Sequence, residues 1–348
     1  MQDVAVIELT SQGLYCPAGD FHIDPWRPVP RAVITHGHAD HARPGNGLYF
    51  AEQSGAPILR HRLGADIQLH PLAYGESIDL EQARISLHPA GHILGSAQVR
   101  VEVDGEVWVA TGDFKRDRDP TCQPFESVAC DTLITEATFA LPIYRWPSLD
   151  TVAADIYDWW RDNARQGRAS VLFCYALGKA QRVLSALCAH TEQRVLLHGA
   201  AVALTDIYRN AGISMLPTLP ALELEADGNK HSKRFAGELI IAPPGANGTA
   251  WMKRFGDCST GFCSGWMLLR GNRRRRGYDR GFVMSDHADW PALLTTIEEC
   301  GARRVLATHG RSDTLVRFLQ EQGRDARELR TEFDDGGGDE VDDAETAA

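Results

Sequence analysis

The sequence predicts an α/β protein in which one domain is interrupted by another. Short apolar segments that end near Gly, Asp or Pro dominate the first 140 residues, as is typical of strands. Strands and helices then alternate, a pattern that favours a mostly parallel sheet. From about residue 281, apolar segments followed by polar loops resume. We therefore expect the first and last parts of the chain to form one domain.

Local signals locate the individual elements. The expected strands of the first part are RAVIT (31–35), ARISLH (83–88), AQVRVEV (97–103), EVWVAT (106–111) and DTLITEA (131–137). A helix is expected over 148–167, because Ser148 or Asp150 can cap its start and Gly167 can end it. A buried strand at 169–177 and a second helix follow it.

Three regions follow from this pattern. Residues 1–149 and 269–330 are expected to form one α/β domain, and 150–268 an α/β insertion. Residues 331–348 contain eight acidic residues, no basic residue and three consecutive glycines, which predicts a disordered acidic tail. Without this tail the net charge changes from -11 to -3, so the body of the chain is nearly neutral.

Composition excludes several classes of protein. With 43% hydrophobic and 24% charged residues, the chain is neither disordered nor fibrous. No apolar run approaches the roughly 18 residues that a membrane helix needs, and the N-terminus has no secretory signal pattern. The eight cysteines lack paired spacing, which favours reduced thiols and a cytoplasmic location.

The strongest chemical signal is THGHADHA at 35–42, directly after a predicted strand. It places His36, His38, Asp40 and His41 within six residues. Imidazole and carboxylate groups are ligands that zinc or manganese prefers. On an extended turn, His36 and His38 can face one side while Asp40 and His41 face another, so this spacing suits two neighbouring ions.

Three further residues at expected strand ends or turns complete the ligands. His92 lies in GHILGSAQV, Asp113 in VATGDFK and His309 in VLATHG. The predicted sets are His36, His38 and His92 for one ion and Asp40, His41 and His309 for the other, with Asp113 bridging both. Two ions about 3.5–4 Å apart can activate a water for attack on an electrophile. The sequence therefore predicts a metallohydrolase.

These motifs resemble the metallo-β-lactamase superfamily, and TEATF (135–139), YALGKAQRVL, SDHADW (285–290) and THG (308–310) resemble its β-CASP nucleases. The resemblance implies a metallo-β-lactamase αβ/βα sandwich with an inserted α/β β-CASP domain. It implies that Asp24 orients a ligand, with Asp20 as the competing candidate, and that His287 acts near the scissile phosphate with Glu136 orienting it.

Within that group, YCPAGDFHIDPWRP, SGWMLLRG and SDHADW are similar to bacterial DNA ligase-associated exonucleases. This similarity implies a metal-dependent DNA exonuclease that acts in repair beside an ATP-dependent DNA ligase and a helicase. An inserted domain over the site would favour single-stranded or frayed ends.

Other functions stay open at this point. His309 is typical of RNA-processing members, so a ribonuclease is the main alternative. A small-molecule metallohydrolase and an inactive scaffold subunit are the remaining alternatives.

Several residues outside the ligand sets are candidates for binding nucleic acid. Lys179 and Gln181 follow Gly178 at an expected helix start, where free N–H groups attract phosphate. Ser264 is a further candidate for a phosphate contact. The densest basic run is Arg273, Arg274, Arg275 and Arg276, with Arg270 and Arg280 nearby. Such a run suits contacts to the phosphate backbone that do not depend on base sequence.

Overall fold

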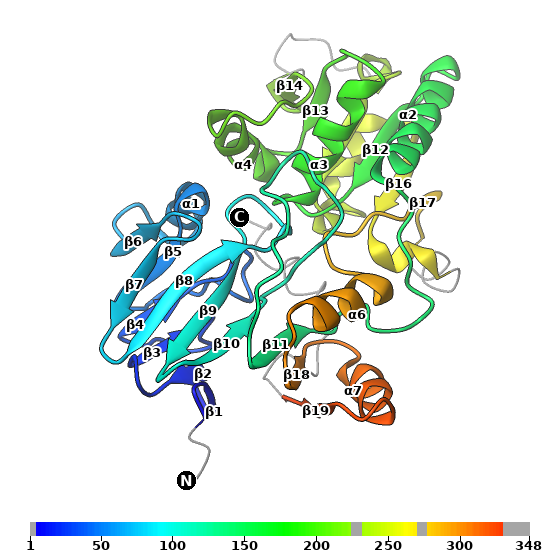
Figure 1. The fold of residues 1–348 in the computed structure, drawn as a ribbon. Helices are drawn as coiled ribbons and strands as arrows, with labels where there is room; N and C mark the ends of the chain where they lie inside the picture. Colours follow the sequence, from blue (N-terminus) through cyan, green and yellow to red (C-terminus); the bar gives the residue numbers. More distant parts are fainter. Residues whose placement is uncertain (1–4, 224–231, 270–276, 330–348) are drawn as a thin grey trace. The chain divides into compact units, whose positions relative to one another are not determined.

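A computed structural model describes residues 5–223, 232–269 and 277–329 (Figure 1). These residues divide into two compact units. Unit 1 contains the chain up to Arg145 and from His287 onward, and unit 2 contains Trp146–Asp286.

Unit 1 contains two mixed sheets, each partly antiparallel and partly parallel. The first has the order β1-β2-β3-β4-β5-β6 and is parallel from β3 to β6. Its strands are β1 Glu8–Thr10, β2 Gly13–Cys16, β3 Phe21–Ile23, β4 Arg31–Val33, β5 Leu48–Glu52 and β6 Leu69–Leu72. The second has the order β19-β18-β11-β10-β9-β8-β7 and is parallel from β10 to β19. Its strands are β7 Ser77–Leu80, β8 Ala83–Pro89, β9 Ala97–Val103, β10 Glu106–Ala110, β11 Thr132–Glu136, β18 Arg304–Thr308 and β19 Asp325–Glu328.

The two sheets of unit 1 pack face to face and carry helices on their outer faces. One core joins them, with Phe21, Val33 and Phe50 from the first sheet and Val99 and Trp108 from the second. On the outer face of the second sheet, α6 (Trp290–Glu299) and α7 (Ser312–Glu321) cover residues of β10, β11 and β18. On the outer face of the first, α1 (Ala56–Leu63) covers β4 and β5. This layering confirms the predicted αβ/βα sandwich.

Unit 2 is a parallel sheet between helices and short turns. Its order is β14-β13-β15-β12-β16-β17, and every neighbouring pair is parallel. The strands are β12 Ala169–Phe173, β13 Val195–Leu197, β14 Thr218–Pro220, β15 Leu239–Ala242, β16 Cys258–Cys263 and β17 Arg280–Phe282. The helices are α2 Leu149–Arg165, α3 Lys179–Ala186 and α4 Gly199–Asn210. Alternating strands and helices thus form the expected α/β sheet.

Several expected elements agree closely with the structure. The segment expected at 97–103 is β9, and the helix expected over 148–167 is α2, whose first turn is capped by the Ser148 side chain. Unit 2 extends further than the expected insertion of 150–268, because β17 pairs with β16 and so belongs to the same sheet. The predicted acidic tail at 331–348 lies outside the described residues.

A close approach between two glycines fixes the loop that carries His92. Gly95 has a φ of 76°, and a Cβ atom there would lie 2.2 Å from the Cα of Gly55. Gly55 directly precedes α1. Only glycine at position 95 meets both constraints, so the loop can pack directly against the start of this helix.

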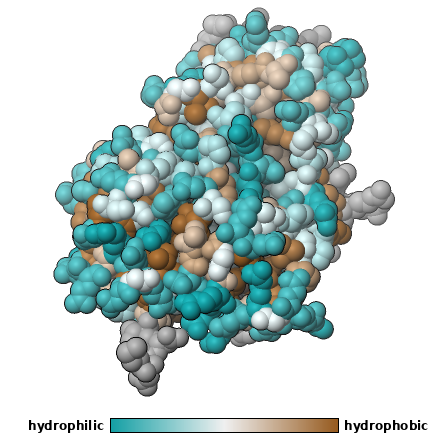
Figure 2. All heavy atoms as spheres, in the orientation of Figure 1, coloured by the Kyte–Doolittle hydropathy of each residue, from teal (hydrophilic) through white to brown (hydrophobic). Residues whose placement is uncertain are grey.

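Hydrophilic residues cover most of the face shown in Figure 2, with hydrophobic residues between them. Among the described residues, no helix has the length and apolar character needed to cross a membrane.

Candidate metal centre

The predicted ligands of unit 1 lie at the ends of strands. His36 follows β4, and Asp113 and His309 follow β10 and β18. His92 lies between β8 and β9, which pair as an antiparallel hairpin. Because β10, β11 and β18 are parallel neighbours, their carboxyl ends share one edge of the sheet. The register pairs Glu136 with Thr308, the residue before His309, so the fold brings these distant segments together.

The first ligand set forms a compact, buried cluster. His36 Nε2 and His92 Nε2 each lie 3.1 Å from His38 Nδ1. The ligand atoms of His36, His38, His92 and Asp113 all lie within 4.8 Å of one another. Nitrogens about 3.3 Å apart would occupy neighbouring corners of a tetrahedron with metal–nitrogen distances of about 2.0–2.1 Å. Three imidazoles and one carboxylate in this arrangement fit a zinc-like divalent ion.

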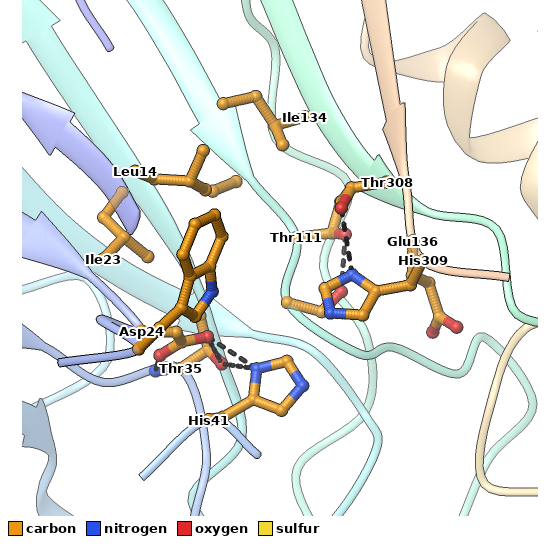
Figure 3. Close-up of a pocket in the computed structure, with 13 residues that line it drawn as sticks. Leu14, Ile23, Asp24, Thr35, His41, Thr111, Ile134, Glu136, Thr308 and His309 are labelled. Atoms are coloured by element: carbon orange, nitrogen blue, oxygen red, sulfur yellow. Dashed lines mark hydrogen bonds and ion pairs between the residues drawn. The ribbon is translucent and has the colours of Figure 1, made fainter. Parts of the chain in front are cut away.

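The second set surrounds His41. Its Nε2 lies 3.6 Å from Asp40 Oδ2 and 3.4 Å from Asp113 Oδ2. The rings of His41 and His309 stack with centroids 5.6 Å apart (Figure 3). Two carboxylates and two imidazoles again match the ligand preference of a divalent ion.

Asp113 is the residue that the two sets share. Its Oδ2 lies 3.5 Å from His36 Nε2 and 3.8 Å from His92 Nε2, in addition to the contact with His41. Burial alone would raise the pKa of Asp113, but the rings of His41, His287 and His36 outweigh it and hold the pKa well below its usual range. The carboxylate is therefore ionised, as a bridging ligand must be.

The histidines have different charge states in the chain itself. Burial, together with His41 and His92, lowers the pKa of His36 well below its usual value and keeps it neutral. Burial also opposes protonation of His41, but Asp40 and Asp113 outweigh this effect and raise its pKa well above the usual value. A cation bound at this position would replace that proton.

A hydrogen-bond network behind the ligands orients them (Figure 3). Asp24 Oδ2 lies 2.7 Å from His41 Nδ1, and the Thr35 hydroxyl donates to the same oxygen over 2.6 Å. The Thr35 hydroxyl also lies 3.0 Å from His36 Nδ1. One threonine thus contacts a ligand of each set. Asp20, the competing candidate, is instead a surface residue that forms an ion pair with Arg31.

Two residues of this region have left-handed backbone conformations. Asp24 has a φ of 43° and His309 a φ of 60°. Residues other than glycine adopt this region at a cost and persist there only when their surroundings determine the conformation. The Thr308 hydroxyl lies 3.1 Å from His309 Nδ1 and helps to hold that ring. A small cavity of about 40 Å³ lies beside these groups, between His41, His309 and the apolar side chains of Trp26 and Ile134.

Glu136 and His287 form a pair beside Asp113. Glu136 Oε2 lies 2.9 Å from His287 Nδ1, and Glu136 Oε1 accepts from the Phe114 N–H over 2.7 Å. His287 Nδ1 is 3.9 Å from Asp113 Oδ2. The structure thus brings together the two residues that the β-CASP resemblance singled out. Asp289, two residues further on, caps α6 through a bond from the Ala292 N–H.

The residues predicted to bind substrate have internal contacts in unit 2. Lys179 Nζ lies 3.1 Å from Asp286 Oδ1, and both side chains are at most 3% exposed. Gln181 accepts from the Gly178 N–H and donates to Thr205. These contacts stabilise the start of α3 and leave Lys179 and Gln181 no surface for a substrate.

Ser264 is also buried, and its hydroxyl accepts from the Trp266 N–H. It therefore caps a short helical turn instead of facing solvent. Arg273–Arg276 and Arg270 lie outside the described residues. Arg280, in β17, has a side chain that is 44% exposed.

Sequence reasoning missed the residues that orient the ligands. Thr35 and Thr308 directly precede ligating candidates, and the Phe114 N–H is a backbone group. Arg62 of α1 donates to the carbonyl oxygen of Gly37, inside the histidine motif. A threonine at the end of a strand is a weak signal, and a backbone donor or an arginine from a distant helix leaves no signal at all.

Thr35→Val is expected to weaken metal binding about 10–100-fold, because it removes the hydroxyl that contacts Asp24 and His36. Thr35→Ser keeps the hydroxyl and should bind within a few-fold of the unaltered protein. Competition with a chromogenic chelator measures both affinities. Equal affinities for the valine and serine variants would show that this network does not orient the ligands.

Comparisons with known proteins agree with this architecture. No protein-family model matches the chain. The chain is 32% identical over 319 residues to a protein from Opitutus terrae named probable DNA ligase, covering 91% of this chain and 30% of that protein. It is 30% identical over 113 residues to an RNase J-like protein from Methanocaldococcus jannaschii, covering 32% of this chain and 27% of that protein.

A third relative is the endoribonuclease YSH1 of Gibberella zeae, which is 31% identical over 120 residues, or 34% of this chain and 14% of that protein. The chain thus spans less than a third of the length of each of these relatives. Among solved structures, a protein of unknown function from Enterococcus faecalis has a TM-score of 0.56 at 12% identity, over 87% of this chain and 79% of that one. This last similarity concerns the fold alone. The resemblance seen in the motifs is confirmed by the relatives and the sandwich fold, and the chain belongs to the β-CASP group of the metallo-β-lactamase superfamily.

Proposed function

We propose that the chain hydrolyses phosphodiester bonds of nucleic acid with the help of two divalent ions, zinc or manganese. The observation that carries this proposal is the position of the Asp113 carboxylate. Its Oδ2 lies between 3.4 and 3.9 Å from ring nitrogens of His36, His41, His92 and His287. One ionised oxygen can therefore serve both ligand sets and still lie near the imidazole that would donate a proton.

Seven residues would hold the ions. His36, His38 and His92 would bind one ion, Asp40, His41 and His309 the other, and Asp113 both. When bound, such a pair lowers the pKa of a water and neutralises negative charge that develops on the phosphate. The ionised state of Asp113 and the neutral state of His36 support this assignment.

His287 would donate a proton to the oxygen that leaves the phosphate. Glu136 Oε2 faces His287 Nδ1, so the carboxylate would hold the N–H at that nitrogen and leave Nε2 to carry the transferred proton. The Phe114 N–H fixes the other oxygen of Glu136. Because Phe114 directly follows Asp113, the same loop would orient both the shared metal ligand and the proton donor.

We propose DNA as the substrate, shortened from single-stranded or frayed ends during repair and beside a DNA ligase. The similarity to the probable DNA ligase covers 91% of this chain but 30% of that protein. A segment similar to nearly the whole chain is thus part of a longer protein named as a ligase, which supports a functional link. The similarities to the two proteins named as ribonucleases cover 32% and 34% of the chain.

A ribonuclease is the second candidate. The names of those two relatives favour it, and so does His309, which is typical of RNA-processing members of the group. The same ligands and proton donor would serve either substrate, because the phosphodiester bond is common to both. The two candidates differ in the sugar that the protein accepts, so they must be separated by experiment.

His287→Ala is expected to lower kcat about 10²–10⁴-fold, because no group would then protonate the leaving oxygen, while both metal ions stay bound. Glu136→Gln keeps a hydrogen bond to His287 but removes the charge, so a smaller loss is expected. Turnover of a labelled oligonucleotide and metal content by mass spectrometry are the measurements.

The metal content distinguishes this role from direct ligation. The ligand atoms of Asp113, Glu136 and His287 also lie within 4.8 Å of one another, so they could hold an ion themselves. Loss of an ion from His287→Ala would assign the histidine to the metal and contradict its role as a proton donor.

Digestion of matched single-stranded DNA and RNA, each labelled at the 5′ or the 3′ end, tests the substrate. With zinc or manganese added, we expect progressive shortening of DNA, and the label lost first reveals the polarity. Asp113→Ala should be inactive and serves as the control for contaminating nuclease. Cleavage of RNA alone would overturn the DNA proposal, and cleavage of neither by the metal-loaded protein would overturn nuclease activity itself.

A further inference from the structure

Two cysteines of unit 1 lie side by side at a distance from the metal centre ligands in the chain. Cys130 precedes β11, and Cys300 directly follows α6. The Cys130 N–H donates to the Cys300 carbonyl oxygen over 3.0 Å, and the two thiols are hydrogen-bonded to each other. A backbone bond of this kind brings two Cα atoms into the range of roughly 4.4–6.8 Å that disulfides span.

The thiol pair and the Glu136–His287 pair lie at opposite ends of the same two elements. The strand β11 runs from the Cys130 side to Glu136, and α6 follows His287 and ends at Cys300. At one end, Glu136 Oε2 and His287 Nδ1 are 2.9 Å apart. At the other end, the thiols meet within the same core cluster. Strand and helix are thus joined at both ends.

The environment makes one of the two thiols reactive. The Cys130 thiol donates to the Cys300 sulfur and, with the Ala302 N–H and Arg324, lowers the pKa of Cys300 to about 7. The same hydrogen bond raises the pKa of Cys130, which keeps its proton. Cys130 is only half-buried. A thiolate beside a protonated resolving thiol is the arrangement found in redox-sensitive cysteine pairs.

We propose that Cys130 and Cys300 are a redox modification site that forms a reversible disulfide when a peroxide oxidises the protein. The Cys300 thiolate attacks one oxygen of hydrogen peroxide, the O–O bond breaks, and a sulfenic acid and hydroxide form. The Cys130 sulfur then attacks the Cys300 sulfur and displaces the hydroxyl group, which leaves as water with the Cys130 proton. Two thiols and one peroxide thus yield one disulfide and two waters, and a thiol reductant restores the pair.

The disulfide would link the two segments of unit 1 on either side of unit 2, because Trp146–Asp286 lies between the two cysteines in the sequence. Closing such a long loop restricts the unfolded chain. We therefore expect the oxidised protein to unfold at a temperature about 4–8 °C higher than the reduced protein.

A second cysteine pair provides a matched control. Cys174 and Cys263 directly follow Phe173 and Phe262, which are partners in the register of β12 and β16. Both cysteines are fully buried. Burial raises the pKa of Cys263 to about 12 and also raises the pKa of Cys174. Two neighbouring thiols that keep their protons and are inaccessible to the oxidant should stay reduced.

Peptide mapping by mass spectrometry tests the proposal. The reduced full chain is treated with a stoichiometric amount of hydrogen peroxide at neutral pH, alkylated and digested. We expect a peptide that joins Cys130 to Cys300 and disappears after treatment with dithiothreitol, together with the reversible rise in unfolding temperature. Cys130→Ser and Cys300→Ser should abolish both effects, and Cys174→Ala should leave both unchanged.

Two results would overturn the proposal. One is a Cys130–Cys300 pair that stays reduced while the exposed Cys188 is oxidised. The other is a Cys174–Cys263 cross-link that forms as fast as the Cys130–Cys300 cross-link. The mapping uses the unaltered protein, so it decides the question even if a serine variant fails to fold. It also does not depend on the proposed nuclease activity.

Discussion

The buried charge of Asp113 is the constraint around which unit 1 is organised. An ionised carboxylate that is 7% exposed loses most of its contact with water and must be compensated by its surroundings. Four imidazole rings provide this compensation through nitrogens that converge on one oxygen atom. The rings come from three separate parts of the chain, so the charge can be held only when the two sheets and the last strands are assembled.

The sandwich explains how such distant residues meet. The parallel strands β10, β11 and β18 end at one edge, and each is followed by a residue of the site or ends in one. The turn to Asp113 contains Gly112, where a Cβ would lie 2.7 Å from the Thr35 side chain. The glycine therefore lets the loop of the shared carboxylate contact the threonine that orients His36 and His41. Ligands and orienting groups are thus parts of one packed structure.

The sequence was most informative where the chemistry is local. His36, His38, Asp40 and His41 lie within six residues, and their spacing alone indicated two sets of ligands. His92, Asp113 and His309 could be added because each stands at a strand end or a turn. Thr35 could not be recognised, because its role depends on Asp24 and on the fold of the following loop.

Lys179 illustrates the opposite case. A lysine at a helix start suggests a phosphate site, but its partner Asp286 lies far along the chain and the two bury each other. The limits of unit 2 were also beyond local reasoning. The strand β17 is three residues long, and only its pairing with β16 assigns it to that sheet. Both properties arise from tertiary contacts that no local pattern records.

The most direct test of this account is a crystal structure of the manganese-loaded protein with anomalous diffraction. The account predicts two anomalous peaks about 3.5–4 Å apart, with the Asp113 carboxylate bound to both ions. One ion would be bound by His36, His38 and His92, and the other by Asp40, His41 and His309. A single peak, or two peaks that do not share Asp113, would contradict the central role assigned to this carboxylate.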